Sequence, residues 1–432
     1  MYFMYEKNDV SEWKKLDRKA DEIMKKNLLV AQSGSPSAAI NATLCGVLEQ
    51  GLADANIEKI YGVKNGIMGL LSERLINLTE MFSDKADLQL LCQTPSSILG
   101  SCHMKLSAWE ENPFECERAV AILRKYRIGY FVYIVGSDSM DTVHKLSDYC
   151  KAHNIQDIQM IGVPKTVDND LPETDHSPGF GSAAKYIGTT FSEIACDCSV
   201  YALPSITLVE IMGQETGWLT AASALARING NGAPDLIYLC EKPFSIDRFL
   251  FDVREKMMEK HSIIIAVSEG LRNEEGEYLA ESLQHRAEDA VGQRILASVS
   301  RFLEEILRKE IGCKVRSVEL NLMQRCASHI ASVVDIQEAR RMGAAAVQYA
   351  VEGGSGEMVC LQRVSQEPYE TEIFFVPIET VVDHVKEVPL EWIHEDGNDI
   401  MPEMMEYLLP LIQGEFPCTF CNGIPVHFHL PK

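Results

Sequence analysis

The sequence predicts an α/β fold of two Rossmann-like lobes with parallel sheets, a cleft between the lobes and a C-terminal extension. Short apolar runs alternate with longer amphipathic runs through most of the 432 residues, a pattern typical of parallel strands joined by helices. The strands form two groups, with a change of character near Pro178–Gly181. A chain of this length has material for two or three domains, so we expect each group to form a sheet of its own.

The expected strands are short apolar runs, and the expected helices are longer runs with an apolar face. In chain order the strands are Leu28–Ala31, Tyr130–Val135, Ile158–Val163, Ser205–Met212, Asp235–Cys240, Ser262–Val267 and Val315–Leu320. The helices between them are Ala38–Leu48, Met140–Ala152, Ala183–Ile194, Trp218–Arg227, Ile246–Lys260, Arg294–Glu310 and Ile336–Val351.

This order predicts the domain boundaries. The first lobe is expected over residues 1–180, completed by about 326–385, and the second over 181–325. From about Lys386 the chain becomes rich in Pro, Trp and acidic residues, which predicts an extension over 386–432 that wraps the lobes.

Composition and charge exclude several classes of partner. A formal net charge of -23 argues against a nucleic acid or an anionic membrane surface. No apolar stretch reaches the ~20 residues that a membrane helix needs. The thirteen cysteines show no disulfide spacing and the charged N-terminal segment has no apolar signal region, so a cytoplasmic location is expected. A phosphate ligand would need a local positive field from a few Lys and Arg residues, helix N-termini or Mg²⁺.

The segment Pro164–Leu171 carries the strongest chemical signal. It follows a buried strand, so it places Lys165, Asp168 and Asp170 at the carboxyl end of a sheet, where open α/β folds bind ligands. One carboxylate can act as a base while the other is held by a metal or the backbone, and the lysine suits a phosphate. An acidic turn without function is the competing interpretation of these residues taken alone.

Other loops that follow strands have residues suited to phosphates or sugars, and each also has a structural explanation. Small residues that open a helix can bind a phosphate through backbone N–H groups or simply cap the helix. A carboxylate after a strand can accept hydrogen bonds from sugar hydroxyls, and arginines can grip a phosphate or form surface ion pairs. These loops and residues are Gln32–Ala42, Val135–Thr142 with Asp138, Glu210–Leu219, Ser268–Gly270 with Glu269, and the pair Arg316 and Arg325.

Taken in order, the loops resemble the phosphofructokinase family, and most closely its long, pyrophosphate-dependent branch. The likeness runs from about Leu28 to Pro425. The matching segments are Gln32–Gly34, Tyr61-Gly62 with Asn65-Gly66, Thr94–Ser97 with Leu99–Ser101, Pro164–Leu171, Pro178–Ala184, Glu210–Leu219, Ser268–Gly270, Gln324-Arg325, and Asp335 with Glu338-Ala339.

The resemblance implies roles for individual residues. Asp168 matches the base that removes the proton of the sugar's 1-hydroxyl, with Thr166 and Asp170 around the acceptor and metal. Lys165 and Asp138 are the other two catalytic residues that the resemblance implies. They stand where members that use ATP have glycine and another small residue, so both favour pyrophosphate as donor. The remaining implied positions grip the sugar phosphate (Met212, Gly213, Gln214, Glu269, Arg316 and Arg325), bind diphosphate (Gly34, Ser35, His103 and Gly136) or hold the metal (Asp138 and Ser137).

The departures from the family pattern fall mostly on the donor side. The family has Gly where this chain has Ser35 and Val135, a metal-binding Asp or Asn at Ser137, and arginines at His103 and Gln214. Loss of a cationic contact to the transferred phosphoryl group can cost on the order of 10³–10⁵ in rate. The acceptor loop from Lys165 to Asp170 is intact.

Three functional hypotheses follow from the resemblance. The first is a reversible, Mg²⁺-dependent transfer from pyrophosphate to fructose 6-phosphate, in the long branch named diphosphate–fructose-6-phosphate 1-phosphotransferase. The second is a weakened paralogue that binds sugar phosphate as a regulatory subunit beside an active partner. The third is a related kinase that uses ATP or acts on another sugar phosphate, such as sedoheptulose 7-phosphate, and Lys165 and Asp138 argue against ATP. In related enzymes Arg316 reaches into a neighbouring subunit, so a homodimer or homotetramer is expected.

Overall fold

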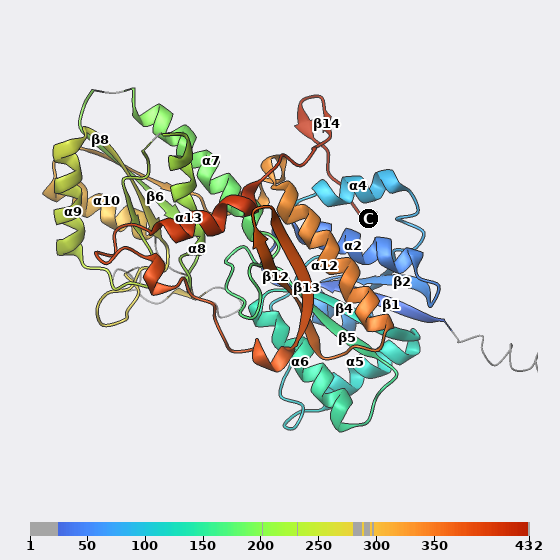
Figure 1. The fold of residues 1–432 in the computed structure, drawn as a ribbon. Coiled ribbons are helices and arrows are strands. Elements are labelled where there is room, and N and C mark those ends of the chain that lie inside the picture. The colour runs from blue at the N-terminus through green and yellow to red at the C-terminus, as the bar shows by residue number, and fades with distance from the viewer. Residues whose placement is uncertain are drawn as a thin grey trace, which may run out of the picture.

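The computed structural model describes residues 25–200, 202–230, 232–279, 287–288, 294–295 and 298–430. Two lobes lie side by side, each with a central sheet and helices on both faces (Figure 1). The predicted α/β class with parallel sheets in two lobes is therefore confirmed.

The first lobe has a sheet of seven strands in the order β13-β12-β5-β4-β1-β2-β3. The pairs from β12 through β5, β4 and β1 to β2 are parallel, and the two edge pairs are antiparallel. The strands are β1 Lys26–Gln32, β2 Ile57–Val63, β3 Leu75–Asn77, β4 Ile128–Val135, β5 Gln159–Pro164, β12 Glu357–Gln366 and β13 Tyr369–Pro377.

Successive residues of the central strands enter two different cores, which explains why every residue of β4 is buried. Val132 and Ile134 belong to one core, and Phe131 and Tyr133 to the other. The helices of the first core are α2 Ile40–Ala53, α4 Lys85–Gln93 and α12 Val333–Val351, and those of the second are α3 Gly66–Leu71, α5 Phe114–Lys125 and α6 Ser137–Ala152.

Helices α2 and α12 are distant in sequence but pack backbone to backbone. A Cβ at Gly46 of α2 would lie 1.9 Å from the Arg340 carbonyl oxygen, and a Cβ at Gly343 of α12 would lie 2.1 Å from that of Thr43. Only glycine permits this approach. The polypeptide therefore leaves the first lobe, builds the second, and returns to complete the core of the first.

The second lobe has four parallel strands in the order β11-β6-β8-β7. The strands are β6 Ser205–Ile211, β7 Leu236–Tyr238, β8 Ser262–Ser268 and β11 Lys314–Glu319. Its helical elements are α7 Phe180–Cys198, α8 Trp218–Ala221, η1 Ala222–Asn229, α9 Ile246–Glu259, α10 Val299–Glu310, α11 Met323–Cys326 and η3 Ser328–Ile330.

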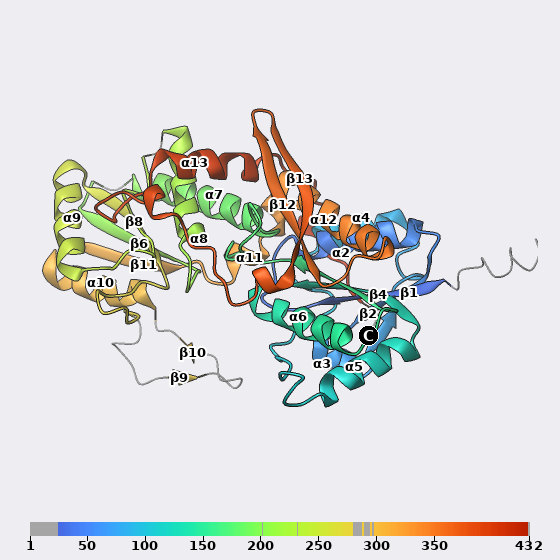
Figure 2. The same cartoon turned by 60° about the horizontal axis from the view of Figure 1, so that its bottom comes forward.

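The C-terminal extension runs from the first lobe across the second and back again (Figure 2). Its end contacts the first lobe, where the rings of Phe428 and Phe82 lie 4.8 Å apart. Its elements, with the short helix that precedes it, are η4 Ile378–Thr380, η5 Leu390–Trp392, α13 Pro402–Leu408, η6 Leu409–Ile412, β14 Phe420–Cys421 and β15 Ile424–Pro425.

The helix predicted over Arg294–Glu310 was wrong at its start. The observed helix α10 begins at Val299, because the Ser298 side chain accepts a hydrogen bond from the Arg301 N–H and caps it. Arg294 and Ile295 instead form β10, which pairs with β9 (Ala287–Glu288). The helix predicted over Trp218–Arg227 is α-helical only as far as Ala221 and continues as a 3₁₀ helix.

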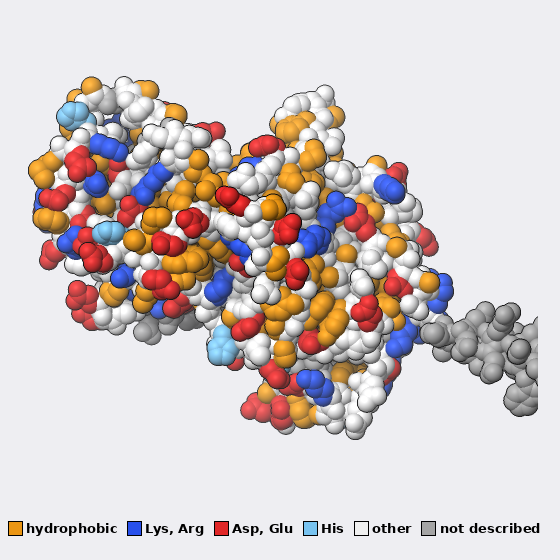
Figure 3. All heavy atoms as spheres, in the orientation of Figure 1, with side chains coloured by type: hydrophobic (Ala, Val, Ile, Leu, Met, Phe, Trp, Pro, Cys, Tyr) orange, Lys and Arg blue, Asp and Glu red, His pale blue; other side chains and the backbone are white. Residues whose placement is uncertain are grey.

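Charge on the surface is mixed. On the face drawn in Figure 3, the described acidic and basic side chains are interspersed, and the basic ones do not gather into one patch. Within the described ranges, no helix has both the length and the apolar character needed to cross a membrane.

Candidate active site

The segment Pro164–Leu171 leaves β5 at the carboxyl edge of the first sheet. The Lys165 N–H donates to the Val135 carbonyl at 2.8 Å, which extends the pairing with β4 by one residue. Beyond it the chain turns, with the Asp168 N–H donating to Thr166 Oγ1 at 3.1 Å and Asn169 in a left-handed conformation at φ 56°. This turn places Asp168 and Asp170 on either side of a buried asparagine.

Lys165 lies between two glycine loops. Its ammonium donates to the Ser35 carbonyl and lies 3.2 Å from the position of a Cβ at Gly34 and 3.7 Å from that at Gly136. Gly34 has φ +76°, so glycine suits this position both in conformation and in space. Lys165 is 1% exposed, and its burial lowers its pKa to about 8, although Asp168 and Asp170 act in the opposite direction.

The two carboxylates are poor in protein partners. Asp168 Oδ1 and Asp170 Oδ1 are buried without a hydrogen bond, and Asp170 Oδ2 accepts one from the Ser137 hydroxyl at 2.9 Å. Burial, together with the charges of Asp170 and Glu269, raises the pKa of Asp168 to about 7 against the opposing effect of Lys165 and Arg325. A buried acceptor left unpaired within the protein is typical of a group that meets a ligand.

The second lobe contributes a turn and a carboxylate that face this loop. The Gly213 N–H donates to Glu269 Oε1 at 3.0 Å, and Gly213 has φ +134°. The Thr216 hydroxyl donates to the Asp168 carbonyl at 2.9 Å and so joins the two lobes at the candidate base. Burial raises the pKa of Glu269.

The other predicted residues divide between this cluster and its surroundings. Thr166 is buried within the loop, Met212 is partly buried, and Gln214 is exposed. Arg325 lies partly buried on α11, and its positive charge lowers the pKa values of Asp168, Lys165 and Glu269.

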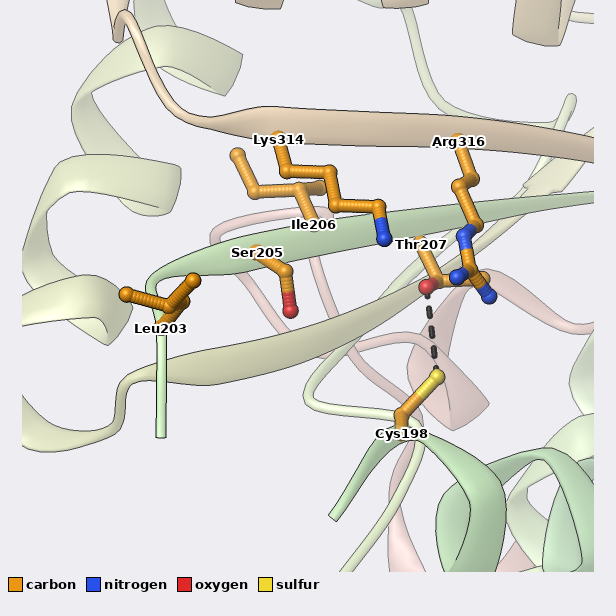
Figure 4. Close-up of a pocket in the computed structure, with 7 residues that line it drawn as sticks. All are labelled: Cys198, Leu203, Ser205, Ile206, Thr207, Lys314 and Arg316. Carbon is orange, nitrogen blue, oxygen red and sulfur yellow. Dashed lines mark hydrogen bonds between the residues drawn. The ribbon is translucent and has the colours of Figure 1, made fainter. Parts of the chain in front are cut away.

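Arg316 lies elsewhere. It pairs with Thr207, four residues before β6 ends at Ile211, and so lies roughly 13 Å from the end of that strand at the usual rise per residue. Its side chain is 45% exposed, faces Asp197 at 3.7 Å, and lines a pocket with Cys198, Leu203, Ser205, Ile206, Thr207 and Lys314 (Figure 4). The structure therefore does not bring Arg316 to the Asp168 cluster of its own chain.

The donor-side residues lie around the Gly34 loop. The hydroxyl of Ser101 donates to the Gly34 carbonyl at 2.8 Å, and the hydroxyl of Ser33 donates to the Cys102 carbonyl at 2.8 Å. These contacts bring the segment that carries the exposed His103 to the loop. The side chain of Asp138 lies outside what the structure describes.

The carboxylates of this loop suit Mg²⁺, which needs few protein ligands, better than a metal ion that is coordinated entirely by side chains. Among the described residues, no group of three or more His, Cys, Asp or Glu side chains is placed to hold a metal ion. Mg²⁺ commonly takes one or two carboxylates and completes its shell with water and substrate phosphates. The unpaired oxygens of Asp168 and Asp170 match that requirement.

Sequence reasoning missed the groups that support the loop from a distance. Asn169 lies inside the predicted segment, and its left-handed conformation is typical of asparagine, so its role had a local signal. Thr216 lies in a segment already singled out. Lys386 and Tyr407, which contact Asn169, belong to the extension, whose role the sequence left open, and more than 200 residues separate them from the loop.

Comparisons with known proteins show the family to which the chain belongs. The family model described as Phosphofructokinase matches residues 27–350. The chain belongs to the phosphofructokinase family.

Several relatives that align over nearly the whole chain are named as pyrophosphate-dependent members, which confirms the resemblance predicted from the sequence. The chain is 38% identical to the pyrophosphate–fructose 6-phosphate 1-phosphotransferase of Xanthomonas campestris over 94% of this chain and 96% of the relative. It is also 38% identical to the Halomonas elongata enzyme of the same name, again over 94% and 96%. The crystal structure of a pyrophosphate-dependent phosphofructokinase from Nitrosospira multiformis superposes with a TM-score of 0.82 at 33% identity, covering 94% of this chain and 98% of that one.

Proposed function

We propose that this protein transfers a phosphoryl group from pyrophosphate to the 1-hydroxyl of fructose 6-phosphate, reversibly and with Mg²⁺. The observation that carries the proposal is the buried Lys165 ammonium, which lies between two glycine loops and beside two carboxylates with unpaired oxygens. The names of the relatives support the same donor and acceptor.

In the proposed reaction, Asp168 accepts the proton of the 1-hydroxyl. The hydroxyl oxygen forms a bond to the near phosphorus of pyrophosphate, the bridging P–O bond breaks, and phosphate leaves. Lys165 stabilises negative charge on the transferred oxygens, because phosphoryl transfer depends mainly on positioning and charge neutralisation. Mg²⁺, held by Asp170 and, in the expected set, by Asp138 and Ser137, would neutralise phosphate charge.

We assign the donor to the first lobe and the sugar phosphate to the second. Ser35, Gly34 and Gly136 lie beside the Lys165 ammonium on the first lobe. Together with His103 they are the proposed diphosphate contacts. Glu269 and the Met212–Gln214 turn, with Arg325 and Thr166, are the proposed acceptor contacts. Exposed Arg316, far from its own Asp168, supports an oligomer in which it serves the site of a neighbouring copy.

One assay tests the proposal. The purified protein is incubated with fructose 6-phosphate, Mg²⁺ and either pyrophosphate or ATP, and fructose 1,6-bisphosphate is measured. We expect product with pyrophosphate and little with ATP. Binding of fructose 6-phosphate without product from either donor would contradict the proposal and favour the regulatory paralogue, whereas faster turnover with ATP would overturn the donor.

The rate is expected to peak between about pH 7 and pH 8. Asp168 can accept a proton only when ionised, and its pKa of about 7 makes the rate rise through that pH. Lys165 loses its charge as pH rises through its pKa of about 8, so the rate then falls. The measurement is kcat/KM for fructose 6-phosphate from pH 5.5 to 9.5.

A matched variant separates this profile from the ionisation of the substrates. The charge of Asp170 helps raise the pKa of Asp168, so Asp170→Asn should move the rising limb to lower pH while the substrates titrate unchanged. A rising limb at the same pH in both proteins would mean that Asp168 is not the titrating base.

A further inference from the structure

The C-terminal extension crosses the candidate catalytic loop at Lys386. The backbone N–H of Lys386 donates to the Asp170 carbonyl at 2.8 Å. Its ammonium donates to Asn169 Oδ1 at 3.3 Å, to the Thr174 carbonyl at 3.1 Å and to the Asp175 carbonyl at 2.8 Å. One residue of the extension therefore contacts both the backbone and a side chain of the loop.

Tyr407, on helix α13, holds the same asparagine from another direction. Its hydroxyl accepts a hydrogen bond from Asn169 Nδ2 at 2.9 Å and donates one to the Asp175 carbonyl at 2.7 Å. The Tyr407 ring is 8% exposed and packs against Trp218, with ring centres 5.2 Å apart. Asn169 Oδ1 also accepts from the Ser177 N–H, so extension residues supply two of the three hydrogen bonds of its amide.

The same stretch of the extension is fixed to the second lobe. Trp218 Nε1 donates to the Lys386 carbonyl at 2.8 Å. Two residues further on, the Val388 N–H donates to Glu241 Oε1, which also accepts from the Gly217 N–H. Lys386 thus connects the Asp168–Asp170 loop of the first lobe to the Gly213–Trp218 turn of the second, where Thr216 contacts the Asp168 carbonyl.

We propose that Lys386 and Tyr407 are positioning residues for phosphoryl transfer, which hold the Asp168–Asp170 loop in register with the second lobe through Asn169. The inference rests on the function proposed above. In-line transfer demands that base, acceptor and donor lie within a fraction of an ångström of their reacting positions, and a displacement of about 1 Å can cost on the order of 100-fold in rate. Neither residue needs to touch a substrate for this role.

The test compares Lys386→Met and Tyr407→Phe with a control from the same stretch, Glu387→Gln, whose side chain is exposed. In the pyrophosphate assay, kcat of Lys386→Met is expected to fall about 10- to 100-fold, as for supporting hydrogen-bond partners of other sites. Tyr407→Phe should lose less, because Phe keeps the ring packing. The KM for fructose 6-phosphate should change less than about threefold, and the control should match wild type.

If the two residues had a purely structural role, their substitution would lower the melting temperature but would not lower kcat while leaving KM nearly unchanged. If Lys386→Met does not fold, Tyr407→Phe decides the question. Retention of wild-type kcat by folded variants would overturn the inference.

Hydrogen exchange separates this inference from the proposed function. The peptide that spans residues 165–171 should exchange faster in Lys386→Met and Tyr407→Phe than in wild type or the control. A wild-type protein without transfer activity would contradict the proposed function only, since the exchange comparison remains informative. Unchanged exchange in the folded variants would overturn the positioning role.

Discussion

Asp168→Asn is expected to reduce phosphoryl transfer by about 10³-fold or more, to near the detection limit. An amide cannot accept the proton of the attacking hydroxyl, and general base catalysis commonly contributes about 10²–10⁴-fold. The site should otherwise survive, because Asp168 Oδ1 makes no hydrogen bond in the protein and Asn has the same shape. The measurement is fructose 1,6-bisphosphate formed from fructose 6-phosphate and pyrophosphate.

Stability provides the control for this substitution. Burial and the neighbouring carboxylates raise the Asp168 pKa to about 7. At pH values above the ordinary pKa of an aspartate, ionised Asp168 therefore lowers the free energy of unfolding. Asp168→Asn removes this destabilisation, so the melting temperature of the variant at pH 8 should be no lower than that of wild type. Asp148→Asn, on the surface of α6, should leave both activity and melting unchanged. A folded Asp168→Asn protein with more than a tenth of wild-type turnover would show that the base is elsewhere.

Lys165→Met is expected to have the second large effect, a loss of about 10³-fold in kcat/KM for pyrophosphate. The estimate follows from the roughly 10³–10⁵ that a cationic contact to the transferred phosphoryl group contributes. Methionine has a similar length and fills the space beside Gly34 and Gly136 without a charge. Binding of fructose 6-phosphate, measured by calorimetry, should change little because the proposed acceptor contacts lie mostly on the second lobe.

The same substitution also changes the charge balance of the cluster. Lys165 lowers the pKa of Asp168, so Lys165→Met should move the rising limb of the pH profile to higher pH. Lys151→Met, an exposed lysine of α6, is the matched control and should behave as wild type. A donor-side role for Lys165 would be contradicted if kcat/KM for pyrophosphate did not fall, or if the affinity for fructose 6-phosphate fell by the same factor.

The elements predicted from the sequence are those whose apolar pattern is undisturbed. β4 is apolar throughout because both of its faces are buried, and β5 leads directly into the candidate loop. β2 was missed because two consecutive charged residues, Glu58 and Lys59, are exposed within it. They interrupt both the continuous apolar run of a buried strand and the apolar–polar alternation of a half-buried one. The β12–β13 hairpin was missed because the outer half of β12 carries exposed polar residues.

Part of the candidate site was accessible from the sequence for a topological reason. The carboxyl ends of neighbouring parallel strands meet at one edge, so Gly213 after β6 and Glu269 after β8 could be grouped without coordinates. Asp168 follows β5 of the other sheet, and only the family resemblance joined it to them. Lys386 and Tyr407 could not be grouped with them, because a hydrogen bond across 217 residues leaves no local pattern. The spatial separation of Arg316 from Asp168 likewise follows from strand register and not from spacing along the chain.

The packing of α2 against α12 has a consequence for synthesis on the ribosome. Roughly 280 residues separate the end of α2 from the start of α12, so at about 5–20 residues per second the apolar face of α2 waits on the order of tens of seconds for its partner. During that time the whole second lobe emerges and can complete its own sheet. The second lobe of the nascent chain can therefore fold before the first, although the first lobe begins at the N-terminus. Until α12 is synthesised, the apolar face of α2 is a surface that must be protected from aggregation.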